Sequence, residues 1–294
     1  MILVINCGSS SVKFAVMEPL EQVMLVSGLA EKLGSDNAEI AIKIGDEKEV
    51  YQLGNAAHTE ALAKLVEVLR AHGLLEKLTA IGHRTVHGGD YFSDSVLITQ
   101  ETVDKVTECN ALAPLHNPAN LLGIAVCAEQ LPNLPQVAVF DTAFHQTMPD
   151  YAYLYATPRS WERDHHVRRY GFHGTSHRYI TQKTAELLGK PQSDLNIISA
   201  HLGNGSSVAA VVGGKSVDTS MGFTPLPGLI MGTRTGDIDP AIITYMMERL
   251  NVSAEAVLDL MNKKSGLLGI SELTNDCREL TEAANKGNSA AQLA

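Results

Sequence analysis

The sequence lacks the cysteine patterns of metal sites and of disulfide-stapled proteins. Its four cysteines, Cys7, Cys109, Cys127 and Cys277, are widely spaced and form no CxxC pair. Zinc ribbons use cysteines a few residues apart, and small secreted proteins carry a dense cysteine framework. The spacing therefore predicts four reduced thiols in a cytoplasmic protein.

Long hydrophobic runs and excess positive charge are also absent. The apolar run Ile2–Ile5 follows no basic start and is too short for a signal peptide. No stretch approaches the roughly 20 residues of a membrane-spanning helix. The net charge of −10 argues against general affinity for nucleic acid or anionic membranes. We expect a soluble protein without either partner, whose few cations gather where a polyanion binds.

The chain length and the pattern of apolar residues indicate a two-domain α/β protein. A chain of 294 residues exceeds one ordinary hydrophobic core. Short β-branched runs alternate with helical patterns. Strands are expected at Ile2–Ile5, Val12–Met17, Gln136–Phe140, Asn196–Ala200 and Val208–Val212. Helices are expected at Asn55–Ala71, at His177–Leu188 after a Thr175 or Ser176 cap, from Asp239-Pro240 to Leu250, and from Ser253 to before Gly266.

A short internal repeat predicts a duplicated fold. Ser10–Val16 (SSVKFAV) aligns with Ser206–Val212 (SSVAAVV), and each copy follows an apolar strand and a turn with Asn and Gly. Two such strand–turn–strand units indicate similar domains that face each other across a cleft. We expect the domains at residues 1–145 and 146–294.

The turn between the first two strands has the composition of a phosphate site. Its small residues let backbone N–H groups approach an anion, and Lys13 adds positive charge. The Walker A pattern is missing, and a single Gly/Ser turn is more often a plain polar hairpin. The second turn, Gly203–Ser207, favours the phosphate interpretation, because two such turns in one chain have no simple structural reason.

Two arginines lie in glycine-rich segments. Arg84 is expected at a strand end, and Arg234 lies between Gly232 and Gly236. A guanidinium matches carboxylate and phosphate groups bidentately. Each arginine alone is more often half of a structural ion pair, whereas the two together fit an anion clamp.

Histidine and aspartate motifs complete the polar set. His173 precedes a helix start, where anions are favoured, although most such histidines only satisfy hydrogen bonds. No HExxH helix is present, and His83 and His87 lie on an expected strand end, so zinc is not expected. Asp141 follows a buried strand, the usual position of a magnesium ligand or base in α/β phosphotransferases; a capping role is the alternative.

Eight motifs between Asn6 and Asp239 resemble the acetate kinase family, and the resemblance runs in order from residue 2 to about Arg278. They are NCGSSSVK (Asn6–Lys13), HRTVHGG (His83–Gly89), PLHNP (Pro114–Pro118), FDTAFHQTMP (Phe140–Pro149), YGFHGTSH (Tyr170–His177), HLGNGSS (His201–Ser207), DTSMG (Asp218–Gly222) and MGTRTGDID (Met231–Asp239). The resemblance implies duplicated RNase H-like domains of the actin, Hsp70 and sugar kinase type around a nucleotide cleft. It also implies a homodimer, ATP and ADP, Mg²⁺, acetate and acetyl phosphate. Because family chains are longer, it implies that the second domain is incomplete here.

The resemblance also implies site residues. The catalytic residues it implies are Arg84, Asp141, His173 and Arg234. It assigns Arg84, Val86, Leu115, His116, Phe172 and Pro225 to the acyl substrate. It assigns Ser9, Ser11, Lys13, His201, Gly203, Asn204, Gly205, Asp276 and Arg278 to ATP and its phosphates, and Asn6 to the metal.

The expected reaction is reversible transfer of a phosphoryl group from ATP to acetate. A carboxylate is already a nucleophile, so the protein has mainly to neutralise and position two anions. Propionate is the nearest alternative acceptor, since one methylene changes discrimination by only about 1–3 kcal/mol. Two other interpretations are an inert fragment that only binds or dimerises, and an Hsp70-type ATPase.

Overall fold

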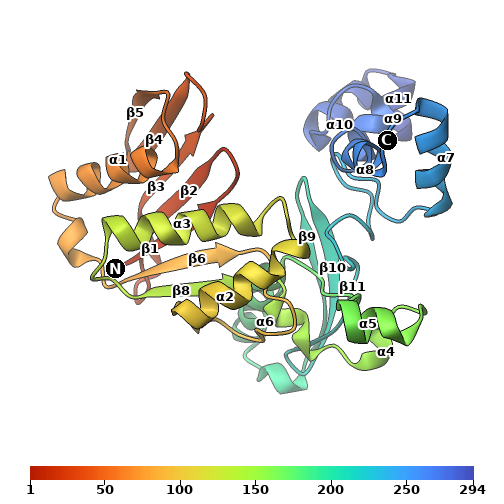
Figure 1. Ribbon diagram of the computed structural model, residues 1–294, viewed down its shortest axis with the longest axis horizontal. Helices are drawn as coiled ribbons and strands as arrows, with labels where there is room; N and C mark the ends of the chain where they lie inside the picture. Colours follow the sequence, from red (N-terminus) through yellow and green to blue (C-terminus); the bar gives the residue numbers. More distant parts are fainter. The chain divides into compact units, whose positions relative to one another are not determined.

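Strand-forming residues in the first half of the chain build one eight-stranded mixed sheet (Figure 1). The computed structural model describes all residues from Met1 to Ala294, and the chain divides into two units, Met1–Ala143 and Phe144–Ala294. The strand order in the first unit is β5-β4-β3-β2-β1-β6-β8-β7. These strands are β1 (Ile2–Cys7), β2 (Val12–Glu18), β3 (Val23–Glu31), β4 (Ala38–Ile44), β5 (Glu47–Gly54), β6 (Ala80–Thr85), β7 (Val96–Leu97) and β8 (Gln136–Phe140).

The pairing of these strands is RNase H-like, as expected. The first five form an antiparallel meander, β6 runs parallel to β1, and β8 runs parallel to β6. Parallel neighbours need long crossovers. One crossover contains α1 (His58–Ala71), and the other contains α2 (Gln100–Glu108) and α3 (Asn117–Gln130), with short 3-10 helices at Leu75–Lys77 and Cys109–Ala111.

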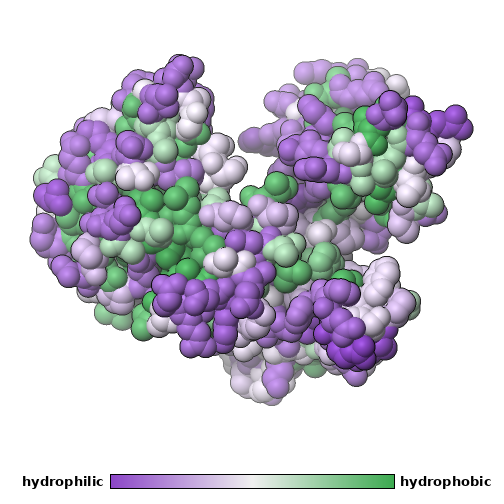
Figure 2. Space-filling model, in the orientation of Figure 1, coloured by the Kyte–Doolittle hydropathy of each residue, from purple (hydrophilic) through white to green (hydrophobic).

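The core of the first unit lies between the sheet and the helices α1 and α3 (Figure 1). In α1, Leu62, Leu65 and Leu69 are buried, which confirms the apolar face expected from their spacing. Helix α3 is apolar through most of its length, and its Leu122 is exposed. Apolar and hydrophilic surface mix on the first unit (Figure 2). No helix in the chain is both long enough and apolar enough to span a bilayer.

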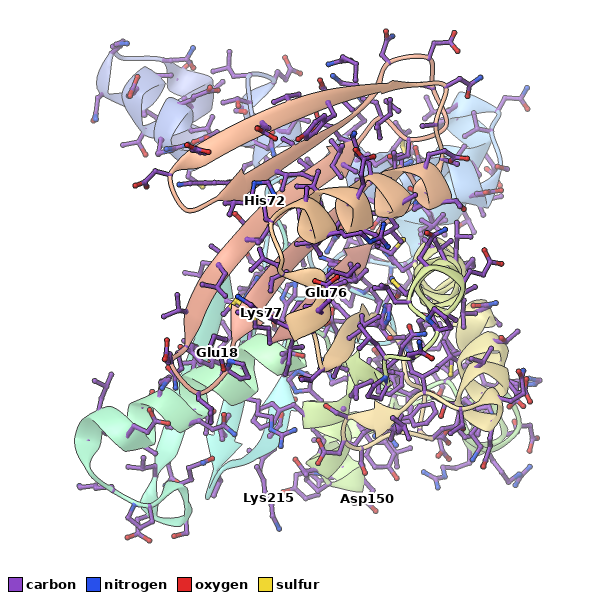
Figure 3. All side chains as sticks on the ribbon, turned by 90° about the vertical axis from the view of Figure 1, so that its left-hand side faces the viewer. Glu18, His72, Glu76, Lys77, Asp150 and Lys215 are labelled. Atoms are coloured by element: carbon purple, nitrogen blue, oxygen red, sulfur yellow. The ribbon has the colours of Figure 1, made fainter.

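The first strand is fastened at its start. The Met1 ammonium donates to the carbonyl of Lys77 at 3.1 Å and lies 4.0 Å from the Glu18 carboxylate, and Figure 3 shows Glu18 and Lys77 at this edge. The contact joins β1 to the segment that leads into β6. These two neighbouring strands carry Asn6 and Arg84.

The second unit contains a three-stranded antiparallel sheet in the order β11-β10-β9. Strands β9 (Asn196–Leu202) and β10 (Ser206–Val212) form a hairpin, as β1 and β2 do, so both copies of the internal repeat are strand–turn–strand units. Strand β11 (Lys215–Thr219) completes the sheet. The helices are α4 (Asp150–Tyr153), α5 (Arg159–His165), α6 (Gly174–Leu188), α7 (Ala241–Leu250), α8 (Ala254–Lys263), α9 (Gly266–Ser271), α10 (Cys277–Asn285) and α11 (Ser289–Leu293), with 3-10 helices at Ala143–Thr147 and Gln192–Asp194.

The helix ends test the capping predictions. Ser253 caps α8 by accepting the N–H of Ala256, and Gly189 ends α6 in the left-handed conformation, as expected. The predicted Thr175 or Ser176 cap of α6 is wrong, because His173 takes a left-handed conformation (φ 59°) and the helix begins at Gly174. Helix α7 begins one residue later than expected, at Ala241, whose N–H donates to Asp239.

Replacing Gly28 with alanine should destabilise the first unit. A Cβ there would overlap the Phe14 ring and the carbonyl of Ala41, and overpacking of this kind costs about 1–3 kcal/mol. Hydrogen exchange of the β2–β4 amides should accelerate accordingly. Gly82→Ala is the matched control, because nothing lies within 4 Å of its added methyl group. Equal exchange in both variants would contradict the packing described here.

Candidate functional site

Three polar side chains of the first unit lie in a row on the sheet face away from α1 and α3. Asn6 on β1 is the register partner of Lys13 on β2, and Arg84 on the neighbouring β6 donates to the Asn6 side chain at 3.3 Å. The residues on either side of Asn6, Ile5 and Cys7, point into the core instead. The alternation of the strands therefore gathers these polar groups on the open face.

Arg84 is held by a carboxylate. Its Nη2 donates to Asp141 Oδ2 at 2.6 Å and its Nε to Oδ1 at 3.1 Å, while the Asp141 side chain is only 5% exposed. Burial alone would lower the pKa of Arg84, but the Asp141 charge outweighs burial and raises that pKa above its ordinary value. A guanidinium has five N–H donors. Asp141 and Asn6 take three, so two remain, and the arginine side chain is 42% exposed.

The loop after β6 is fixed by two buried asparagines from the start of α3. Asn120 accepts the N–H of Val86 at 2.9 Å and donates to the carbonyl of Cys7 at 2.8 Å. Asn117 accepts the N–H of His87 and donates to the His87 carbonyl. One amide group therefore ties the end of β1 to the end of β6, beside Asn6 and Arg84.

The other predicted residues of the first unit lie around these strand ends. Ser9 and Ser11 belong to the hairpin turn, which closes with a bond from the Gly8 N–H to the Ser11 carbonyl. Buried His58 contacts the Gly8 carbonyl at 2.8 Å. Val86 is buried, while Leu115 is 71% exposed and His116 is exposed. The structure therefore brings Asn6, Lys13, Arg84 and Asp141 together and leaves Leu115 on the surface.

In the second unit, Arg234 is largely buried without a carboxylate. Its Nη1 donates to the carbonyl of Pro225 at 3.1 Å and lies 3.9 Å from the sulfur of Met231. Asp237, three residues further on, accepts the N–H of Gly228 instead. Burial lowers the pKa of Arg234 because no anion compensates its charge.

Three of the predicted site residues of the second unit, His173, Gly205 and Arg234, lie next to one another. A Cβ on Gly205 would lie 3.2 Å from Arg234 Nη1 and 3.5 Å from the His173 ring, so the guanidinium and the imidazole both border this glycine. The His173 ring also stacks on His201 at 4.1 Å. His173 adopts a left-handed backbone, which costs a non-glycine residue about 1–3 kcal/mol and is typical of functional positions.

The turn that contains Gly203 and Asn204 is fastened from two directions. The Gly232 N–H donates to the Asn204 carbonyl at 3.0 Å, and Asn275 donates to the Asn204 side chain at 2.8 Å. Next to Asn275, Asp276 caps α10 and pairs with Arg278, which lowers the Asp276 pKa to about 2. Asp276 and Arg278 therefore bind each other at the surface.

A cluster of buried histidines and serines lies behind His173. His177 contacts Ser207 and Ser199, and His145 contacts Ser216 at 2.8 Å and the Phe172 carbonyl at 3.0 Å. Burial lowers the pKa of both His145 and His177 to about 4. These imidazoles are neutral at pH 7 and serve as hydrogen-bonding groups.

The model of the Acetokinase family matches residues 1–294. The chain belongs to the acetokinase family. It is 53% identical over 298 residues to the acetate kinase of Geobacillus sp. (strain WCH70) and 51% identical over 296 residues to that of Bacillus subtilis (strain 168), covering 100% of this chain and 75% of each relative.

Solved structures of the acetokinase family have the same fold. A propionate kinase from Francisella tularensis subsp. tularensis SCHU S4 matches with a TM-score of 0.96 and 51% identity. The acetate kinase of Porphyromonas gingivalis matches with a TM-score of 0.94 and 47% identity. Each match covers 99% of this chain and 75% of the other. The expected fold class is confirmed.

The oxygen atoms expected near magnesium do not form a ready-made metal site in this acetokinase. Asn6 Oδ1 and the Asp141 carboxylate are the hard oxygen ligands that Mg²⁺ prefers, but Arg84 donates to both. No group of three histidine, cysteine, aspartate or glutamate side chains could hold a metal ion. The residues present therefore do not fit a protein-bound magnesium centre by themselves.

Several residues that hold the surroundings of Arg84 and Arg234 in place were not predicted from the sequence. Asn117 and His177 fall inside recognised motifs, and His173 and His177 are four residues apart at a helix start, a spacing that could have drawn attention to them. Nothing along the chain marks Asn120 or Ser207, because their partners are distant in sequence.

Asn120→Ala should loosen the loop that carries Val86. The change leaves the N–H of Val86 and the carbonyl of Cys7 buried without partners, at about 1–3 kcal/mol each. Hydrogen exchange of residues 82–88 should accelerate by at least tenfold. Asn133→Ala, at an exposed position, is the matched control. Unchanged exchange in Asn120→Ala would show that the amide does not hold the two strand ends together.

Acid should destabilise this acetokinase well above the pH at which carboxylates titrate. Burial lowers the pKa of His83, His87, His145 and His177 from 6.5 to about 4. Between these values the unfolded state binds protons that the folded state does not, so stability falls as pH falls from 6.5 to 4. The slope is roughly 1.4 kcal/mol per pH unit for each histidine. Denaturant unfolding at several pH values measures it; a flat profile across this window would contradict the buried neutral histidines.

Proposed function

We propose that the chain catalyses reversible transfer of the γ-phosphoryl group of ATP to acetate, giving acetyl phosphate and ADP. A carboxylate oxygen of acetate bonds to the γ-phosphorus as the bond to the bridging β,γ-oxygen breaks, and ADP leaves with those electrons. No proton has to be removed from acetate. Catalysis then requires cations that neutralise and align the reacting anions.

The observation that carries this proposal is the uncompensated charge of Arg234. A guanidinium that is mostly removed from water without a carboxylate partner is costly, and an anionic ligand reduces that cost. His173 and the backbone at Gly205 border the same guanidinium. The proposal assigns the transferring phosphoryl group to this place, with Asn204 and Gly203 as the turn that supports the phosphates.

Arg84 is the second arginine of the proposal, and it is suited to bind the acetate carboxylate. Asp141 fixes the guanidinium along one edge, while two N–H donors and 42% of the side-chain surface remain available. A second bidentate carboxylate suits those donors. The proposal therefore assigns acetate to Arg84, and gives Asp141 the role of orienting Arg84 rather than that of a base.

Magnesium belongs to the proposal as part of the nucleotide substrate. Mg²⁺ keeps most of its water and binds ATP phosphates with few protein ligands, which agrees with the lack of a ready-made metal centre. The roles of Ser9, Ser11, Lys13, His201, Asp276 and Arg278 toward ATP stay predictions, as do a homodimer and a cytoplasmic location.

Propionate is the second candidate acceptor. The matched structure from Francisella tularensis, at 51% identity, is that of a propionate kinase, while the sequence relatives from Geobacillus sp. and Bacillus subtilis are acetate kinases. One additional methylene is worth only about 1–3 kcal/mol in a pocket. The ratio of kcat/KM for the two acids decides between them, and we expect acetate to be preferred.

The reaction is tested by trapping the acyl phosphate as its hydroxamate, with MgATP and acetate. Arg84→Ala and Arg234→Ala should each lower turnover by about a hundredfold or more, because each removes a charge that stabilises the transition state. Arg163→Ala is the matched control, since Arg163 pairs with Asp164 at the surface. Circular dichroism checks that each variant is folded.

The outcomes separate the alternatives. Acetate-dependent hydroxamate that disappears in both arginine variants supports the proposal. ATP hydrolysis that is independent of any carboxylate would indicate an ATPase. No product and no ATP binding by calorimetry would identify an inert binding module. A near-normal rate in Arg234→Ala would remove Arg234 from the mechanism.

A further inference from the structure

Three buried side chains, Ser199, His177 and Ser207, form a hydrogen-bonded line that ends at His173 in the second unit. Ser199 Oγ lies 2.9 Å from His177 Nδ1, His177 Nε2 lies 2.8 Å from Ser207 Oγ, and Ser207 Oγ lies 2.9 Å from His173 Nδ1. Ser199, His177 and Ser207 come from β9, α6 and β10 and are at most 2% exposed. Two hydroxyls and two imidazoles therefore form one continuous hydrogen-bonded line.

The buried end of the line sets its direction. Ser199 Oγ has a single hydrogen-bond partner, His177 Nδ1. If His177 donated to Ser199, the Ser199 hydroxyl proton would be buried without an acceptor, and buried donors without acceptors are the rarer and costlier case. Ser199 therefore donates, and His177 Nδ1 accepts.

The remaining protons follow from this first one. Burial lowers the pKa of His177 to about 4, so the ring is neutral and carries its one proton on Nε2. His177 Nε2–H donates to Ser207 Oγ. The hydroxyl proton of Ser207 is left for His173 Nδ1. In this arrangement the three donors Ser199 Oγ–H, His177 Nε2–H and Ser207 Oγ–H each have an acceptor.

We propose that the line from Ser199 through His177 and Ser207 holds neutral His173 in the tautomer that carries its proton on Nε2. That nitrogen lies on the side of the ring that faces Gly205, where Arg234 also lies. The line thus makes His173 a hydrogen-bond donor at this place even when its ring is uncharged. Ser199 and Ser207 are positioning residues, because they act through His173.

The inference rests on the proposed function in one respect. If an anion binds beside Arg234, an imidazole that presents a lone pair would repel it, whereas Nε2–H would donate to it. The opposite arrangement of the line puts the His173 proton on Nδ1 and leaves Nε2 as an acceptor. The tautomer itself can be measured without any substrate, so it is tested independently of the reaction.

The test is ¹⁵N NMR of the histidine-labelled chain at mildly alkaline pH, with His173 assigned from a His173→Gln variant. The wild type should show a protonated Nε2 and an unprotonated, hydrogen-bonded Nδ1. Ser199→Ala and Ser207→Ala should give a mixture of tautomers, although Ser199 does not touch His173. Ser216→Ala is the matched control: it removes a buried serine hydroxyl from His145, outside the line, and should leave the His173 signals unchanged.

Kinetics supplies the second measurement. Ser207→Ala should lower kcat about tenfold with little change in the KM for acetate, and Ser207→Thr, which keeps the hydroxyl, should restore most of it. A wild-type His173 with its proton on Nδ1 would overturn the inference whether or not the variants fold, and so would signals that are unchanged in both alanine variants. A wild-type enzyme without acetate-dependent turnover would overturn the proposed function while leaving the tautomer result intact.

Discussion

A guanidinium that has lost most of its water needs an anion, and Arg234 has none in this chain. Its contacts are a carbonyl oxygen and a thioether, and burial lowers its pKa. Folding therefore places a cation where its charge is poorly compensated. Arg84 differs, because Asp141 compensates its charge and Asn6 orients it. The two arginines therefore suit different tasks. Arg234 can bind an anion that compensates its charge, and Arg84 is a fixed guanidinium with two N–H donors left for a ligand.

Apart from the Asp141 carboxylate, neutral polar groups hold the two arginine environments in place. In the first unit the amide of Asn120 ties the end of β1 to the end of β6. In the second unit Ser207 joins His173 to His177 in the interior. Uncharged groups avoid the cost of burying ions and leave the local field to the arginines. An extra carboxylate near Arg234 would compete with an anionic substrate.

Much of the fold could be predicted from the sequence, while the contacts within the site could not. The strand that carries Arg84 and the position of Asp141 after β8 follow from apolar runs and are confirmed. Strands β3, β4 and β5 were not predicted; β5 begins with three charged residues and is mostly exposed, so it lacks the apolar run that marks a buried strand. Asp237 is only three residues from Arg234, yet its carboxylate binds the N–H of Gly228. Sequence spacing did not reveal that Arg234 lacks an anion, because side-chain pairing is decided by the tertiary fold.

The account rests on Arg234 as the place where the transferring phosphoryl group binds. The most direct measurement is the ¹H–¹⁵N signal of the Arg234 side chain during titration of the chain with acetyl phosphate, with the signal assigned from Arg234→Lys. The account predicts a saturable shift of the Arg234 signal at the concentrations that support ATP formation from ADP. An Arg234 signal that stays unchanged while ATP is formed would contradict it.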